Sequence, residues 1–120
     1  MKIAFDTPLT GTDDAGNVGN LTAAQIASLT FTAFVDTVNP PVKSYAVPAA
    51  NVTAATTNAN GSKHITVDAQ ADLKIALVPG TTYYIGLKDS LGSNISPETP
   101  ILTWTDLVTT PSAPTGFTVG

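Results

Sequence analysis

Apolar residues recur at every second position in three segments of the chain. These segments span residues 29–35, 73–78 and 83–88, and their alternating apolar residues are Leu29, Phe31, Ala33, Val35, Leu73, Ile75, Leu77, Tyr83, Ile85 and Leu87. A period of two places one side of an extended strand on a core and the other side in water or against a partner. Clusters of Gly, Pro, Asn and Ser, which favour turns, separate the segments. The pattern predicts an all-β chain folded as an antiparallel β-sandwich.

One short segment is predicted to be helical instead. Residues 21–27 combine good helix formers with Thr22, whose side chain suits the N-cap position. The segment makes only about two turns, and helices of that length depend on packing. We therefore expect a turn of helix or a loop that leads into the next strand.

The composition excludes several classes of protein. The chain has 120 residues, no Cys, no Arg and a formal net charge of −4. The length fits one domain, and the missing Cys excludes disulfides, thiolate metal sites and a Cys nucleophile. Nucleic acid is not an expected partner, because phosphate binding needs clustered Lys and Arg. Thr is abundant, with 20 copies, and its preference for strands accounts for that number without any chemistry.

The sequence shows no targeting or membrane segment. Met1, Lys2 and Ile3 lead directly to Asp6 and Pro8, which leaves no apolar core for a signal peptide. Nowhere does an apolar run approach the ~20 residues that a membrane helix needs. We expect a protein made in the cytoplasm that either stays there or leaves it inside an assembly.

Residues able to support catalysis or metal binding are few and scattered. His64 is the only His and Glu98 the only Glu, and no nucleophile elbow, zinc motif or phosphate loop is present. We expect His64 to lie on a surface strand, and the protein to have no catalytic residues and no cofactor. Residues 13–17, Asp-Asp-Ala-Gly-Asn, offer oxygen ligands for Ca²⁺ but lack the spacing of an EF-hand. The sequence favours a turn there over a metal site.

The segment 77–83, Leu-Val-Pro-Gly-Thr-Thr-Tyr, resembles a motif of the fibronectin type III family, in which Leu-x-Pro-Gly-Thr-x-Tyr precedes strand F. Tyr83 matches the tyrosine of that motif. The resemblance implies an immunoglobulin-like, fibronectin type III-like sandwich over residues 1–105. It also implies that the Tyr83 hydroxyl bonds to backbone a few residues upstream, as a tyrosine corner. Residues 101–105 are similar to strand G.

The first half resembles the same family in an unexpected register. Residues 3–8 are similar to strand B, with Phe5 at the position of the core Trp. Residues 14–29, with an Asp-Ala-Gly-Asn loop and a Leu-Thr pair, are similar to a variant found in bacterial and phage domains. In this register the chain starts at strand B, and strand A is missing from its front.

The missing strand resembles the end of the chain. Residues 111–119, Pro-Ser-Ala-Pro-Thr-Gly-Phe-Thr-Val, are similar to the opening of a fibronectin type III domain, which gives the strand order B-C-C′-E-F-G-A. We therefore treat residues 106–120 as a linker and a strand-like tail. A competing register makes residues 1–6 strand A, 28–36 strand B and 43–47 strand C, and leaves the tail as a linker.

The tail is expected to bind a neighbouring copy of the chain. A seven-residue strand spans about 23 Å, whereas the five residues 106–110 reach at most about 17 Å, so filling the A position of the same copy is strained. Strand addition to a neighbour has no such constraint. The candidate contact residues are Pro111, Ala113, Pro114, Phe117 and Val119. The alternative is a disordered or loosely docked tail, which is common at domain ends.

Two aromatic residues are predicted on outward strand faces. Phe34 and Tyr84 alternate with core positions, so they are candidates for a subunit contact. Tyr84 is also the best candidate for a sugar-binding surface. Trp104, alone in an apolar strand, is expected to pack on the sandwich.

Together these features favour a non-enzymatic structural protein. The resemblance implies a bacteriophage virion protein, either a capsid decoration subunit or a tail-associated subunit, that assembles in the host cytoplasm. Its expected partners are other copies of the chain and a larger capsid or tail protein, with no nucleic acid and no membrane. The alternatives are a carbohydrate-binding or adhesion module that contacts host-surface glycans, and an accessory domain of a larger secreted protein.

Overall fold

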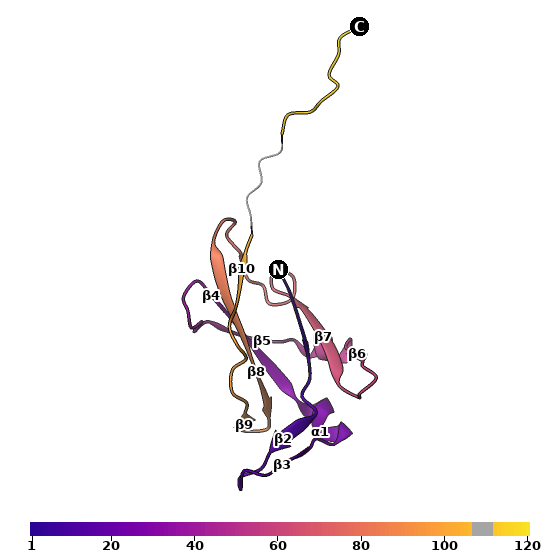
Figure 1. Cartoon of the computed structure of the whole chain (residues 1–120), viewed down its shortest axis with the longest axis vertical. Coiled ribbons are helices and arrows are strands. Elements are labelled where there is room, and N and C mark those ends of the chain that lie inside the picture. Colours follow the sequence, from indigo (N-terminus) through magenta and orange to yellow (C-terminus); the bar gives the residue numbers. More distant parts are fainter. Residues whose placement is uncertain (107–111) are drawn as a thin grey trace.

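The structure is a computed structural model that describes residues 1–106 and 112–120. The described part of the chain is mostly β, and every strand pair in it is antiparallel (Figure 1). Its elements are β1 (Lys2–Asp6), β2 (Thr10–Thr12), β3 (Val18–Asn20), α1 (Ala23–Ser28), β4 (Thr30–Asp36), β5 (Ser44–Ala46), α2 (Ala49–Thr53), β6 (Thr56–Thr57), β7 (Lys63–Asp68), β8 (Thr82–Leu91), β9 (Asn94–Ile95) and β10 (Leu102–Thr105).

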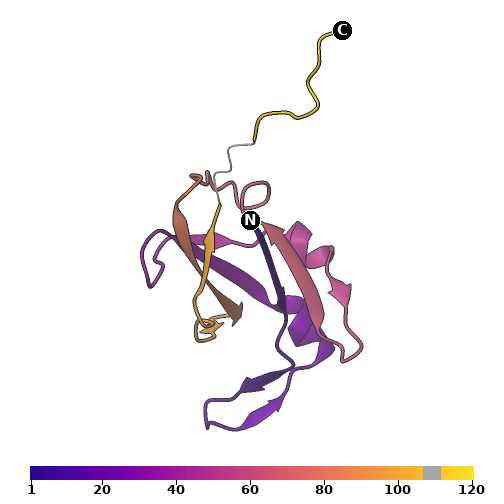
Figure 2. The same ribbon diagram turned by 45° about the horizontal axis from the view of Figure 1, so that its top comes forward.

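Two sheets carry most of the structure. The larger sheet has the order β10-β8-β4-β5, with β9 paired to the end of β8, and the smaller sheet has the order β1-β7-β6. Figure 2 shows β1 and β7 beside the sheet of β4, β8 and β10. The strands β2 and β3 form a separate hairpin. In this arrangement β1 and β10 are both edge strands.

The core lies between the two sheets. Alternate residues of β1, β4, β7 and β8 point into it, and they are Ile3, Phe31, Ala33, Val35, Ile65, Val67, Tyr83 and Ile85. Ile65 is fully buried, and the rings of Phe5 and Phe31 lie 5.1 Å apart between centroids. Burying each large apolar side chain contributes roughly 1.5–3 kcal/mol. The predicted alternation in the segment 29–35 therefore corresponds to β4 and its inward face.

Asp36 ends β4 and is an exception to the polar-outward pattern. Its side chain is buried, and its carboxylate accepts hydrogen bonds from the backbone N–H groups of Thr37, Val42 and Lys43 at 2.8–3.1 Å. These bonds, with the one from Lys43 the largest contribution, lower the pKa of the Asp36 carboxyl. The carboxylate thereby closes the loop that leads from β4 to β5.

The prediction of a strand over residues 73–78 is wrong. Leu73 is buried and Ile75 and Leu77 are half-buried, as the alternation predicts, but the segment pairs with no strand of the described part of the chain. Its backbone makes local bonds instead, because the N–H groups of Leu73 and Ile75 donate to the carbonyls of Asp68 and Ala69. Lys74 has a φ of 60°, which interrupts an extended backbone. The period of two here reflects side chains that pack against the core, although the backbone forms no hydrogen-bonded ladder with another described strand.

Tyr83 and Trp104 pack at one end of the core. The backbone N–H of Val78, five residues upstream, donates to the Tyr83 hydroxyl at 2.8 Å, which is the contact that the resemblance predicts for this tyrosine. Trp104 lies opposite Tyr83 in the β10–β8 ladder, with ring centroids 6.5 Å apart. Both residues face inward.

The predicted helix is present as α1. Thr22 Oγ1 accepts from the Gln25 N–H, and the Gln25 side chain accepts from the Thr22 N–H, so the two residues form a capping box. Ile26 is the buried residue of this helix. The hairpin of β2 and β3 and the helix α2 were not predicted, because their sequences carry no periodic apolar pattern.

The C-terminal residues 112–120 form no helix or strand and lie away from both sheets (Figure 1). All of them are exposed, and Phe117 and Val119 are each 87% exposed. The radius of gyration is 19.1 Å, against about 14 Å for a compact domain of this length. The extended tail accounts for the difference.

Replacing Tyr83 by Phe is expected to destabilise the protein by about 1 kcal/mol, because the substitution removes the hydroxyl that satisfies the Val78 N–H. Chemical denaturation followed by fluorescence measures the change. Tyr84→Phe is the matched control, since the Tyr84 hydroxyl makes no hydrogen bond within the described residues. An equal effect of the two substitutions would contradict a structural role for the Tyr83 hydroxyl.

Candidate functional site

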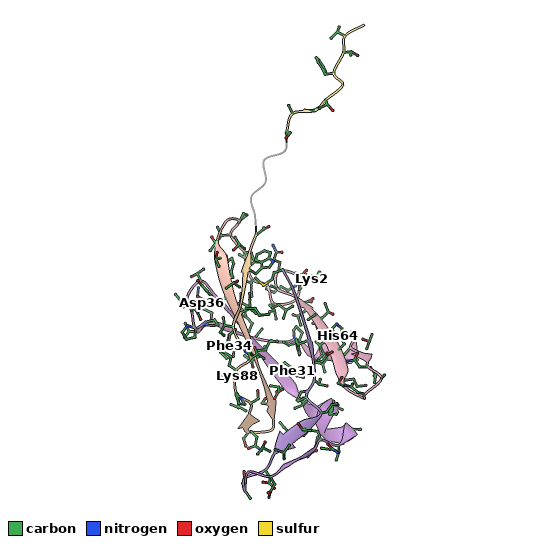
Figure 3. The ribbon with its side chains drawn as sticks, in the orientation of Figure 1. Lys2, Phe31, Phe34, Asp36, His64 and Lys88 are labelled. Carbon is green, nitrogen blue, oxygen red and sulfur yellow. The ribbon has the colours of Figure 1, made fainter. Side chains whose placement is uncertain are left out.

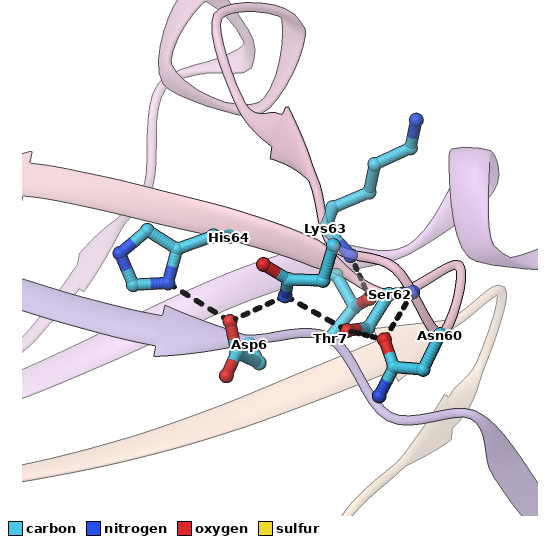
Figure 4. A network of polar contacts seen from close by, with 7 residues as sticks. Asp6, Thr7, Asn60, Ser62, Lys63 and His64 are labelled. Atoms are coloured by element: carbon cyan, nitrogen blue, oxygen red, sulfur yellow. Dashed lines mark hydrogen bonds and ion pairs between the residues drawn. The ribbon is translucent and has the colours of Figure 1, made fainter.

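A polar network lies where β1 ends and β7 begins (Figure 4). His64 Nδ1 is 2.8 Å from Asp6 Oδ1. Asn58 Nδ2 donates both to Asp6 Oδ1, at 3.0 Å, and to Ser62 Oγ, at 2.9 Å. Ser62 Oγ in turn donates to Asn60 Oδ1 at 2.6 Å. The network ties the loop before β7 to the end of β1.

This network contains Ser, His and Asp but does not have the geometry of a catalytic triad. A nucleophilic Ser needs a base within hydrogen-bond distance, and Ser62 bonds to Asn58 and Asn60 rather than to His64. Ser62 is also buried, with 3% of its surface exposed. The hydrogen bond with His64, followed by the bond from Asn58, lowers the pKa of the Asp6 carboxyl. The arrangement fits a structural role, in which the network holds the loop before β7 against the end of β1.

The acidic segment 13–17 forms the turn between β2 and β3. Asp13 Oδ1 accepts from the N–H groups of Ala15 and Asn17 at 2.9 and 2.8 Å. Gly16 has a φ of 84°, which a side chain would disfavour. Within the described residues, no three His, Asp or Glu side chains gather as a potential metal site. The carboxylate of Asp13 is used by the turn itself.

The predicted outward aromatics lie on the outer face of β4 and β8. Phe34 is opposite Gly86 and Tyr84 is opposite Asp36, so the two rings are diagonal neighbours. Both are half-buried. Lys88 Nζ lies over the Phe34 ring at 5.3 Å from its centroid, where the cation is attracted to the ring face (Figure 3). The side chains of Glu98 and Ile101 fill the space over Gly86.

The outer edge of β1 is unpaired among the described residues. Antiparallel strands exchange bonds at every second residue. The Thr7 N–H donates to the Lys63 carbonyl at 2.9 Å, and the Met1 carbonyl accepts from Ala69 at 3.0 Å, so the odd-numbered residues of β1 face β7. Lys2, Ala4 and Asp6 therefore direct their N–H and C=O groups away from β7. These three residues form an open sheet edge.

A groove of about 240 Å³ lies between this edge and β10. Its larger apolar side chains include those of Met1, Ile3, Ile85, Leu102 and Trp104. Leu102 lies opposite Ile85 on the inward face of its sheet, yet Leu102 is 69% exposed and Ile85 only 9%. The groove is smaller than a typical small-molecule pocket of about 300–1,000 Å³ and has the size for a few side chains. Leu102 is therefore an inward-facing apolar side chain that the described residues leave exposed at this groove.

The tail residues named from the sequence do not fill this groove in their own copy. Ala113, Pro114, Phe117 and Val119 are exposed, and none of them lines the groove. Pro111 lies outside the described residues. The tail is predicted from the sequence, and the groove is not. Leu102, whose place in an alternating strand predicts burial, was the one signal for it.

Comparison of the chain with models of protein families, with curated proteins and with solved structures finds no match. In the described residues, no helix has the length and apolar character needed to cross a membrane.

Both ends of β1 are held by charged side chains. At the start of the strand Lys2 Nζ lies 3.0 Å from Asp68 Oδ2. The pKa of the Asp68 carboxyl is lowered to about 2. The largest cause is the hydrogen bond from the Ala71 N–H, followed by the hydrogen bond from the Lys2 side chain, and the Gln70 N–H contributes a further bond. A lowered carboxyl pKa means that the folded state favours the ionised form. The stabilisation from Asp68 is therefore present above about pH 4 and is lost as the pH falls through 2.

Asp68→Asn is expected to lower the free energy of unfolding at pH 6. The difference in free energy of unfolding between the variant and the natural chain should shrink as the pH falls from 4 to 2. Denaturation curves at pH 6, 4 and 2.5 measure this. Asp14→Asn is the control, because the Asp14 side chain makes no hydrogen bond or ion pair among the described residues. A difference that stays constant with pH would argue against the ionised carboxylate as the cause.

Proposed function

We propose that the protein is a non-enzymatic structural subunit of a bacteriophage particle, a capsid decoration or tail-associated protein that acts through protein–protein contacts. The observation that carries this proposal is the open edge of β1 beside an uncovered apolar groove. An unpaired strand next to a groove with an exposed apolar side chain, Leu102, is a surface suited to another polypeptide segment.

We also propose that the fold is an immunoglobulin-like sandwich of the fibronectin type III kind. In such sandwiches strands A, B and E share one sheet and C, F and G share the other. Pairing of β1 with β7, and of β8 with β4 and β10, fits the assignment of B with E and of F with C and G. The place beside β1, where strand A would lie, has no strand among the described residues.

The competing register, in which residues 1–6 are strand A and 28–36 are strand B, does not fit these pairings. It requires β1 to pair with β4, but the two strands belong to different sheets. It also requires β4 and β5 to lie in opposite sheets, and they are neighbours in one. The pairings thus favour the register in which β1 is strand B.

The assignment to a phage particle is supported by the resemblance of residues 14–29. This segment contains the turn of the β2–β3 hairpin and the capped helix α1. A low content of charged residues, 12%, also favours protein contacts, because charged side chains are depleted in the centres of interfaces. The alternative sugar-binding function needs a free aromatic face. Lys88 and the half-burial of Phe34 and Tyr84 argue against it.

Particles of the phage that encodes the chain, purified on a density gradient, are expected to contain the chain at a fixed ratio to the major capsid or tail protein. Quantitative mass spectrometry of the particle band measures the ratio, with a nonstructural phage protein as the control. Recovery of the chain only in the soluble fraction would contradict the proposal. Glycan binding that depends on Tyr84 would support the adhesion alternative instead.

A further inference from the structure

We propose that the groove beside β1 binds the C-terminal tail of a second copy, residues 115–119, as an added antiparallel strand. This inference rests on the proposed role in assembly and names the partner of the open edge.

The open edge dictates which tail residues face the groove. Lys2, Ala4 and Asp6 carry the free backbone groups of β1, and their side chains are exposed. In an antiparallel pair, residues directly opposite one another project to the same side of the sheet. Tail residues that bond to these three must therefore point outward, and their neighbours must point into the groove. Phe117 and Val119 are two residues apart, so both enter the groove together.

The chemistry of the tail suits the groove. Residues 112–120 contain no charged side chain, so docking buries no charged side chain of the tail. Phe117 and Val119 are largely exposed in the free tail, and Leu102 is largely exposed in the free groove. Docking would cover all three apolar side chains at once. Gly116 has a φ of 70° in the free tail and can extend on docking, because glycine has no Cβ to restrict it.

The position of the tail favours a second copy over the same copy. The groove is lined by Met1 to Ala4 on one side and by Leu102 to Trp104 on the other, and β10 ends near the point where β1 starts (Figures 1 and 2). A tail that turned directly back along its own groove would run parallel to β1. Parallel pairing is slightly less stable than antiparallel pairing. A tail from another copy can enter from the opposite end and run antiparallel.

Edge-to-edge pairing of two β1 strands is the competing arrangement. Centred on Ala4, it would place Lys2 of one copy opposite Asp6 of the other, which is electrostatically favourable. It would leave the side chain of Leu102 and the groove uncovered, however. Insertion of the tail satisfies both the backbone edge and the apolar surface, so we favour the tail as the occupant.

Disulfide trapping tests the proposal directly, because the chain contains no Cys. One chain carries Ala4→Cys, and a second chain with a different tag carries Thr118→Cys or Gly116→Cys. If Phe117 and Val119 point into the groove, the tail residue opposite Ala4 is either Gly116 or Thr118, and the two variants cover both of these registers. Opposite residues in such a pair are about 5.5 Å apart between Cα atoms, within the range of a disulfide. In the control, the second chain carries Ser93→Cys in place of a tail substitution. Ser93 lies on the exposed turn between β8 and β9.

The expected result is a mixed disulfide dimer from Ala4→Cys with at least one tail variant, well above the Ser93→Cys control. A chain that carries both substitutions should give a ladder of multimers. Three outcomes would overturn the proposal: no mixed dimer above the control, closure of the disulfide within one chain, or linkage of Ala4→Cys mainly to itself.

A second measurement does not depend on introduced Cys. Phe117→Ala with Val119→Ala should weaken self-association by at least about tenfold, measured by sedimentation, because two buried apolar contacts are lost. Thr118→Ala, on the outward side of the same strand, should have little effect. These residues are exposed in the free chain, so folding is not at risk. An unchanged association constant would exclude the tail as the contact.

The two proposals can fail separately. If the chain is present in purified particles but no mixed disulfide forms, only the strand exchange is wrong. If the mixed disulfide forms but the chain is absent from particles, only the assignment to a phage particle is wrong.

Discussion

The ladder between β4 and β8 is the interaction on which the rest of the structure depends. It pairs Thr30–Asp36 with Tyr84–Ser90 over seven residues. Because antiparallel partners share a face, this register places Val35 beside Ile85 on the core side and Phe34 beside Gly86 on the outer side. A shift of one residue would turn the apolar side chains of one of the two strands away from the core. The flanking strands β5 and β10 take their positions from this central pair.

The period-two pattern predicted the strands that lie in this ladder. It failed for a segment whose side chains pack on the core but whose backbone does not pair with another described strand. In β4 and β8, alternation and hydrogen bonding coincide, so the pattern was sufficient. Residues 73–78 show the same alternation because their apolar side chains also reach the core. Their backbone donors, however, are satisfied by the turn after Asp68 and by the Tyr83 hydroxyl. Apolar spacing reports burial of side chains and does not report where the N–H groups go.

The candidate site could be predicted only in part. The chain showed a tail with the pattern of a strand, and the resemblance pointed to a missing strand at the front. The groove itself depends on which strands are edges, and this follows from pairings such as that of β1 with β7, more than 55 residues apart in sequence. Leu102 illustrates the limit. Leu102 lies two residues from Trp104 and shares its face of β10. The exposure of Leu102, however, depends on whether another strand lies beside it, and the local sequence does not show this.

An open groove and a protruding tail on the same chain are unlike surfaces, and they give any assembly built from them a direction. A contact between two different surfaces closes into a ring or continues as a row. In a row, one end presents an empty groove and the other an unused tail, so the two ends differ in stability and in what they can bind. The first copy would still expose Leu102, and only a protein that supplies its own strand could cover it. Such a row could start on one partner and stop on another.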